Sequence, residues 1–217
     1  MKKIKILTAL AGLVFFGPGA AMAQYAAQNN SLGVNAGGLS YAGRFSVDAP
    51  MGTFTSVYGS LTYRRKLIHR LFLRAELLGG QVKADNWKVE SQYQKPQGRF
   101  QSGIGEFSLK AEYDFIDLQT YKVSPFVNIG AGGYMLMGYE SDAGEKEGSD
   151  LSGLVMPVGI GIKYKLNNRV KLLAEGNMRF FANNLDGRTG ENISNPNKYY
   201  GLGIGFIYEL ERVNALW

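Results

Sequence analysis

Residues 102–115 alternate strictly between two kinds of side chain. One face of the alternation is apolar and includes Phe107 and Leu109, whereas the other carries Glu106 and Lys110. A half-buried strand of a soluble sheet also alternates, but such a strand is usually about five or six residues long. Repeated segments of about ten residues with this alternation are typical of a membrane β-barrel, whose apolar side chains face lipid and whose polar side chains face the lumen.

The alternation recurs along the chain and predicts an all-β fold. The connections between the alternating segments differ in length, and outer-membrane barrels place short turns in the periplasm and long loops outside. The sequence therefore predicts an eight-stranded antiparallel up-and-down transmembrane β-barrel with a filled polar lumen and with both termini in the periplasm. The predicted strands are 31–43, 54–66, 71–83, 102–115, 124–139, 154–165, 169–181 and 199–210.

The first 23 residues have the three parts of a secretory signal peptide. Lys2 and Lys3 form a basic start, 6–16 is apolar, and Ala21 and Ala23 are the small residues that signal peptidase reads. The apolar run is shorter than the roughly 20 residues that a membrane helix needs. We expect cleavage of a signal peptide at 1–23, which leaves one outer-membrane β-barrel domain at 24–217.

Composition limits the remaining possibilities. After the leader, no stretch approaches about 18 uninterrupted apolar residues, so a membrane-spanning form of the chain is expected to be a closed barrel. The chain has no cysteine, so its stability must come from strand pairing and packing. The formal net charge of +6 falls to about +3 without the leader lysines, which is too weak a bias to indicate nucleic acid binding.

The inward faces of the predicted strands carry charges of both signs. A barrel of this size is only wide enough for side chains to fill it, so these charges are expected to interlock and leave no open channel. Buried charges must be paired, which favours a structural role over acid–base catalysis by Glu106, Glu112 or Glu175. The predicted structural charge network of the lumen is Arg64, Arg74, Glu76, Glu106, Lys110, Glu112, Lys163, Lys171, Glu175 and Arg179.

Other candidate chemistry is weak. His69 is the only histidine, and it lies in the tightest predicted periplasmic turn, whereas a barrel hydrolase needs a histidine beside a serine near the outer leaflet. The acidic residues of loop 140–153 lack the spacing of a calcium-binding loop. We therefore expect no catalytic residue, no metal site, no cofactor and no small-molecule substrate.

Basic residues form a collar at the first predicted periplasmic turn. Its members include Arg65, Lys66, His69 and Arg70. Lysine and arginine at a membrane edge commonly bind lipid headgroups, and docking of an acidic partner surface is the alternative. The collar matters because a barrel with a plugged lumen must act through its rims.

Several stretches of the chain, in their order and spacing, resemble the PorG family, the small outer-membrane barrels of the type IX secretion system of Bacteroidota. The resemblance implies a non-enzymatic component of this protein secretion machinery. The periplasmic side of the barrel would contact the ring that the lipoprotein PorK forms with PorN. The stretches that carry it are LTYR at 61–64, LFLRAE at 71–76, EFSLKAEYDF at 106–115, SPFVNIG at 124–130, PVGIGIKYKL at 157–166, LAE at 173–175 and RFF at 179–181.

On this topology, the turns and the C-terminal segment supply the expected contacts with the PorK and PorN ring proteins. An alternative is a free-standing surface barrel in the outer-membrane lipid, which binds external ligands or host molecules through its long loops 84–101 and 182–198. A lipid-modifying enzyme is a third possibility, against which the position of His69 argues. The candidate periplasmic contacts are Arg65, Lys66, His69, Arg70, Asp117, Tyr121, Lys122, Asn168, Arg212 and Trp217.

Overall fold

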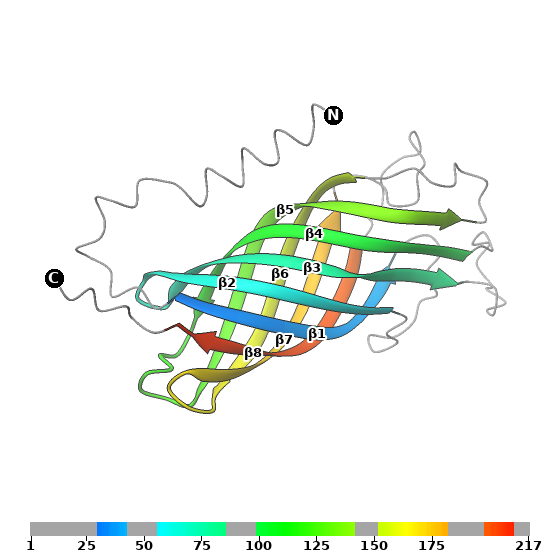
Figure 1. Cartoon of the computed structure of the whole chain (residues 1–217). Coiled ribbons are helices and arrows are strands. Elements are labelled where there is room, and N and C mark those ends of the chain that lie inside the picture. Colours follow the sequence, from blue (N-terminus) through cyan, green and yellow to red (C-terminus); the bar gives the residue numbers. More distant parts are fainter. Residues whose placement is uncertain (1–29, 43–55, 86–98, 142–151, 182–197, 211–217) are drawn as a thin grey trace. The chain divides into compact units, whose positions relative to one another are not determined.

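The strands of the computed structural model close into a barrel, in which each strand pairs antiparallel with the next and β8 pairs with β1 (Figure 1). The structure describes residues 30–42, 56–85, 99–141, 152–181 and 198–210. The predicted eight-stranded antiparallel barrel is confirmed, and no predicted strand end differs from the observed one by more than three residues. The strands are β1 (Asn30–Ala42), β2 (Ser56–Ile68), β3 (Leu71–Asp85), β4 (Arg99–Asp114), β5 (Val123–Ser141), β6 (Ser152–Lys165), β7 (Val170–Phe181) and β8 (Lys198–Glu209). The predicted signal peptide at 1–23 lies outside the described residues.

The ladder between β1 and β8 completes the barrel. Its register runs from the Ser31 and Glu209 pair to the Ala42 and Lys198 pair, and in Figure 1 the blue β1 lies beside the red β8. Closure joins the two edges of the sheet, whose backbone groups would otherwise lack partners in hydrocarbon.

The outer surface of the barrel is apolar. In β2, Val57 and Leu61 are 70% and 60% exposed, whereas their neighbour Tyr58 is 4% exposed. Ile160 in β6 and Ile204 in β8 are 66% and 69% exposed. A contiguous exposed apolar surface of this kind is unfavourable in water and suits contact with hydrocarbon. The predicted outward faces are confirmed by these exposures.

Three short connections lie at one end of the barrel, which we call the short-turn rim: 69–70, 115–122 and 166–169. The first is a two-residue turn in which Arg70 has a φ of 67°. This left-handed conformation costs about 1 kcal/mol or more for a residue with a Cβ, but nothing for glycine. Arg70 is held there by two bonds, since its carbonyl accepts from Asp114 N (2.9 Å) and its Nη1 donates to Phe115 O (3.1 Å).

The other two short connections are fixed by side-chain oxygens. The Ser124 hydroxyl donates to Ile116 O (2.7 Å) and accepts from Ile116 N (3.2 Å), which closes the β4–β5 connection. Asn167 Oδ1 accepts from Arg169 N (2.8 Å) and Val170 N (2.7 Å) in the β6–β7 turn. The short-turn rim is therefore built of defined turns.

The lumen is filled, as predicted, but polar groups do not fill all of it. Its half near the long connections holds an apolar layer, in which the Tyr134 and Phe181 rings pack edge to face at 4.6 Å. Polar and charged side chains fill most of the other half, where Phe126, Leu173 and Ile207 form a smaller apolar cluster. The strand residues of the apolar layer lie at inward positions and form one cluster: Leu39, Tyr58, Leu78, Ile104, Tyr134, Leu136, Val155, Phe181 and Tyr199.

Glycines in β8 make room for large lumen side chains. A Cβ at Gly203 would overlap the Tyr58 hydroxyl and approach Asn35 Oδ1 to 2.7 Å. A Cβ at Gly201 would lie 2.5 Å from Asn177 Oδ1. The side chains of Tyr58, Asn35 and Asn177 thus occupy the space left by these two glycines, whereas at Gly205 the nearest obstacle is a backbone oxygen.

The substitution Gly203→Ala is expected to lower the free energy of unfolding by about 1–3 kcal/mol, because the added methyl overpacks the lumen. Gly79→Ala is the matched control, since a Cβ at Gly79 meets nothing within 4 Å. The measurement is urea-induced unfolding of the two purified variants in lipid vesicles, followed by circular dichroism. Equal stability of the two variants would contradict the packing assigned to Gly203.

Candidate functional site

The inward faces of β2, β3, β4, β6 and β7 bring charged side chains together in the lumen. We call this set the lumen charge cluster. It contains five cationic and five anionic residues, each at most 4% exposed. Its formal charge is therefore zero, which is the condition under which a group of buried charges is tolerated. The members are Arg64, Arg74, Lys110, Lys163, Arg179, Glu76, Glu106, Glu112, Asp114 and Glu175.

Glu112 is at the centre of the part of the lumen charge cluster that lies nearest the short-turn rim. Lys163 Nζ lies 2.5 Å from Glu112 Oε1 and also donates to Asp114. Arg64 Nη2 lies 2.6 Å from Glu112 Oε1. The Arg64 guanidinium nitrogens make no aligned hydrogen bond within the described residues, so Arg64 is held by its charge and by the Phe72 ring, whose centroid is 4.3 Å away.

Arg74 and Glu76 connect this part to the middle of the lumen. Arg74 donates to Glu76 (2.5 Å), Glu175 (2.6 Å) and Glu112 (3.2 Å). Glu76 in turn accepts from Lys110 Nζ (2.9 Å) and Arg179 Nη2 (2.7 Å). Because several of these contacts join strands that are not neighbours in the sheet, they tie opposite walls of the barrel to each other.

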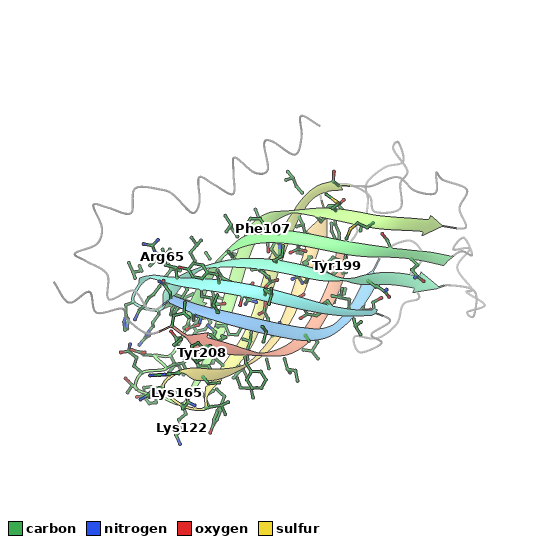
Figure 2. The ribbon with its side chains drawn as sticks, in the orientation of Figure 1. Arg65, Phe107, Lys122, Lys165, Tyr199 and Tyr208 are labelled. Atoms are coloured by element: carbon green, nitrogen blue, oxygen red, sulfur yellow. The ribbon has the colours of Figure 1, made fainter. Side chains whose placement is uncertain are left out.

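The cluster ends below the apolar layer. Arg179 Nε lies 3.0 Å from Glu106 Oε2, and Tyr199 donates its hydroxyl hydrogen to the same oxygen (2.7 Å). Tyr199 also belongs to the apolar layer, and Figure 2 shows it within the barrel. The charged and apolar parts thus meet at this residue, and the lumen is packed on both sides of it.

Nine of the ten residues in the predicted charge network belong to the lumen charge cluster, and Lys171 does not. Lys171 faces inward but lies at the mouth of the barrel, where its ammonium pairs with Glu209 (2.5 Å). Asp114 and Tyr199 were missing from the prediction. Asp114 sits on the charged face of its strand and was identifiable by that position, whereas a tyrosine gives no such signal.

Glu106, Glu112 and Glu175 also belong to the lumen charge cluster, and each contacts at least one arginine or lysine. Glu175 accepts a further bond from Asn128 Nδ2 (3.2 Å). At most 2% of each of these residues is exposed, so substrate cannot reach them without repacking of the lumen. The arrangement is suited to sealing and stiffening the barrel.

The candidate partner contacts gather at the short-turn rim. Figure 2 shows Arg65, Lys122 and Lys165 at this end of the barrel. Tyr121 is 62% exposed, and His69, Lys122 and Asn168 are also exposed, whereas Asp117 is half-buried. The predicted contacts Arg212 and Trp217 lie outside the described residues.

A cavity of about 410 Å³ opens at the mouth of the lumen, within the short-turn rim. We call it the rim cavity. Phe72 and Leu118 supply buried apolar walls, and the Asp114 end of the lumen charge cluster also lines it. The cationic residues that line it are Lys66, Arg70, Lys165, Arg169 and Lys171.

In the part of the chain that the structure describes, no group of three or more histidine, cysteine, aspartate or glutamate side chains is placed to hold a metal ion. In the same residues, no helix has the length and apolar character needed to cross a membrane.

Comparison with known proteins places the chain in a family. A family model described as "Domain of unknown function (DUF6089)" matches residues 10–208. The chain belongs to the DUF6089 family. No curated protein matches the sequence of this DUF6089 protein.

Solved structures resemble the DUF6089 protein in fold. Neisserial surface protein A is 14% identical, with a TM-score of 0.54 over 85% of this chain and 100% of that chain. A major outer membrane protein from Thermus thermophilus is 13% identical, with a TM-score of 0.50 over 83% of this chain and 99% of that chain. The DUF6089 protein therefore has the fold of eight-stranded outer-membrane β-barrels.

The substitution Glu112→Gln is expected to lower the free energy of unfolding by about 3–5 kcal/mol, because it leaves buried cations without their counter-charge. Adding Lys163→Met to the same chain restores neutrality and is expected to recover part of the loss. Glu209→Gln is the control, since its pair with Lys171 is partly open to water and contributes about 0–1 kcal/mol. Urea unfolding in lipid vesicles measures all three, and a Glu112→Gln variant as stable as the control would show that charge balance does not stabilise the lumen.

Proposed function

We propose that this protein is a non-enzymatic β-barrel of the outer membrane and a component of the type IX protein secretion machinery, which associates through its short-turn rim with the PorK–PorN ring. The observation that carries the proposal is the filled lumen. A charge-balanced cluster and an apolar layer occupy it, so solute passage is not the task of this barrel, and its rims are left as the active surfaces. The sequence resemblance to the PorG family supplies the identity of the machinery.

The outer surface supports the assignment to a membrane. Tyrosines and a phenylalanine ring the barrel beside the short-turn rim, with Tyr113, Tyr164 and Tyr208 each exposed and facing outward. Phe115 packs edge to face on Tyr113, with ring centroids 5.4 Å apart. Aromatic side chains favour the boundary between hydrocarbon and water, so this ring marks one membrane edge. The basic residues of the rim then lie on its aqueous side.

The orientation can be tested with single cysteines, because the chain has none of its own. Tyr121→Cys places a thiol on the short-turn rim, and Glu145→Cys places one in the long connection 142–151. With the short-turn rim in the periplasm, a membrane-impermeant maleimide is expected to label Glu145→Cys in intact cells, and Tyr121→Cys only after the outer membrane is opened. Labelling of Tyr121→Cys in intact cells would reverse the proposed orientation.

The ring association is tested by purification from cell envelopes in mild detergent, through a tag in the loop 140–153. PorK and PorN are expected to be recovered with the barrel, and neutralising Arg65, Lys66 and Arg70 with glutamine is expected to reduce their recovery, because the rim loses its cationic contacts. Lys198→Gln, at the opposite end of the barrel, is the matched control.

Recovery of the barrel alone would favour the free-standing surface protein, which acts through its long loops. A second measurement is independent of detergent: deletion of the gene is expected to block export of type IX cargo while other outer-membrane proteins remain in place. Normal cargo export from the deletion strain would refute the proposed function.

A further inference from the structure

The rim cavity has an unusual position for a binding site on a barrel. Phe72, Asp114 and Lys171, which line it, occupy inward positions of their strands. The outward aromatic residues of the membrane edge, such as Tyr113 and Tyr164, do not line it. The cavity therefore opens along the barrel axis to the aqueous side and not towards the lipid around the barrel.

Cationic charge in the rim cavity exceeds anionic charge. Lys171 is neutralised by Glu209, and Asp114 by Lys163. Among the residues that the structure describes, no acidic side chain pairs with Lys66 or Lys165, although both line the cavity.

Asp117 is the remaining acidic residue of the cavity wall among the described residues. Its Oδ1 accepts from Gln119 N (2.9 Å), which leaves the negative charge of the carboxylate in place. The five cationic residues of the wall outnumber Asp114, Asp117 and Glu209, so the cavity keeps a net positive charge in partial shelter from water.

Arg70 is the most informative of these cations. It occupies a left-handed backbone conformation that glycine would adopt without cost. One guanidinium nitrogen reaches Phe115 O, but Nε is buried without a hydrogen-bond partner in the described structure. An arginine at this position thus brings a positive charge to the cavity wall, with donor capacity that its own turn does not use.

The walls restrict the class of ligand. Phe72 and Leu118 are apolar and buried, and Ile116 and Leu210 add further apolar surface beside the cations. A free inorganic anion would leave these walls uncovered. A volume of about 410 Å³ accommodates a few side chains, so a peptide with adjacent acidic and apolar residues matches both the charge and the walls.

The geometry points to a peptide-binding site: the rim cavity receives an acidic segment of a protein on the aqueous side of the short-turn rim, with carboxylates on Arg70 and Lys66 and an apolar side chain against Phe72 and Leu118. The inference rests on the proposed function only in that a protein partner lies on this side. It adds the chemistry of the contact and separates cavity residues from the outer rim residues Arg65 and Lys122.

The test uses the purified full barrel in a zwitterionic detergent and a fluorescent tripeptide, Glu-Leu-Glu, blocked at both ends. The peptide is expected to bind, and Arg70→Gly and Lys66→Gln are each expected to weaken binding about ten-fold or more, as for loss of a charge-assisted hydrogen bond. Arg70→Gly removes the side-chain bond to Phe115 O, although glycine tolerates the φ of the turn. Lys66→Gln leaves the turn unchanged, so a loss of binding in both variants is not a loss of folding. Lys198→Gln, far from the cavity, is expected to bind like the unaltered chain.

Three results would overturn the inference: no binding of the peptide, equal binding of its Gln-Leu-Gln counterpart, or equal peptide affinities of Arg70→Gly, Lys66→Gln and the Lys198→Gln control. Displacement of the peptide by an equal concentration of inorganic phosphate would also overturn it, in favour of a general anion site. Because no ring protein is present, these outcomes are independent of the purification experiment. If the peptide binds but PorK and PorN are not recovered with the barrel, the peptide-binding site is supported and the proposed association with the PorK–PorN ring is refuted.

Discussion

The barrel depends on the ladder between β1 and β8. Closure satisfies the backbone groups of both strands, and it also fixes the number of strands and hence the width of the lumen. At that width, water cannot form a continuous column beside side chains as large as Arg74 or Tyr199. The inward residues must therefore pack against each other, and any charge among them must find its counter-charge inside the barrel.

The inward residues are distributed unevenly along the barrel axis. Charged residues occupy the short-turn half of the lumen in equal numbers of each sign, and the Leu39, Leu78 and Leu136 side chains belong to the apolar layer of the other half. The rim cavity opens beside the charged half of the lumen, so the described residues favour polar recognition at the short-turn mouth.

The alternation of single strands predicts the fold and the inward face well, because each depends on a period of two within one segment. The charge on Arg74 was predictable in the same way, but its contact with Glu175 was not, since it joins β3 to β7 across the lumen. The apolar layer was readable from the inward positions of Leu78 and Ile104. The rim cavity was not, because its walls come from three separate connections and the inward ends of several strands.

The neutrality of the lumen also determines the field at its mouth. A cluster with no net charge contributes little beyond its own pairs, so the potential at the short-turn rim is set by the rim residues. Outward cations such as Arg65 and Lys122 stand in water, where salt at physiological strength screens them within about 8 Å. Lys66 and Arg70 line a cavity with apolar walls, where screening is weaker. The outer cations are thus suited to attract an acidic partner, and the cavity cations to discriminate between partners once they arrive.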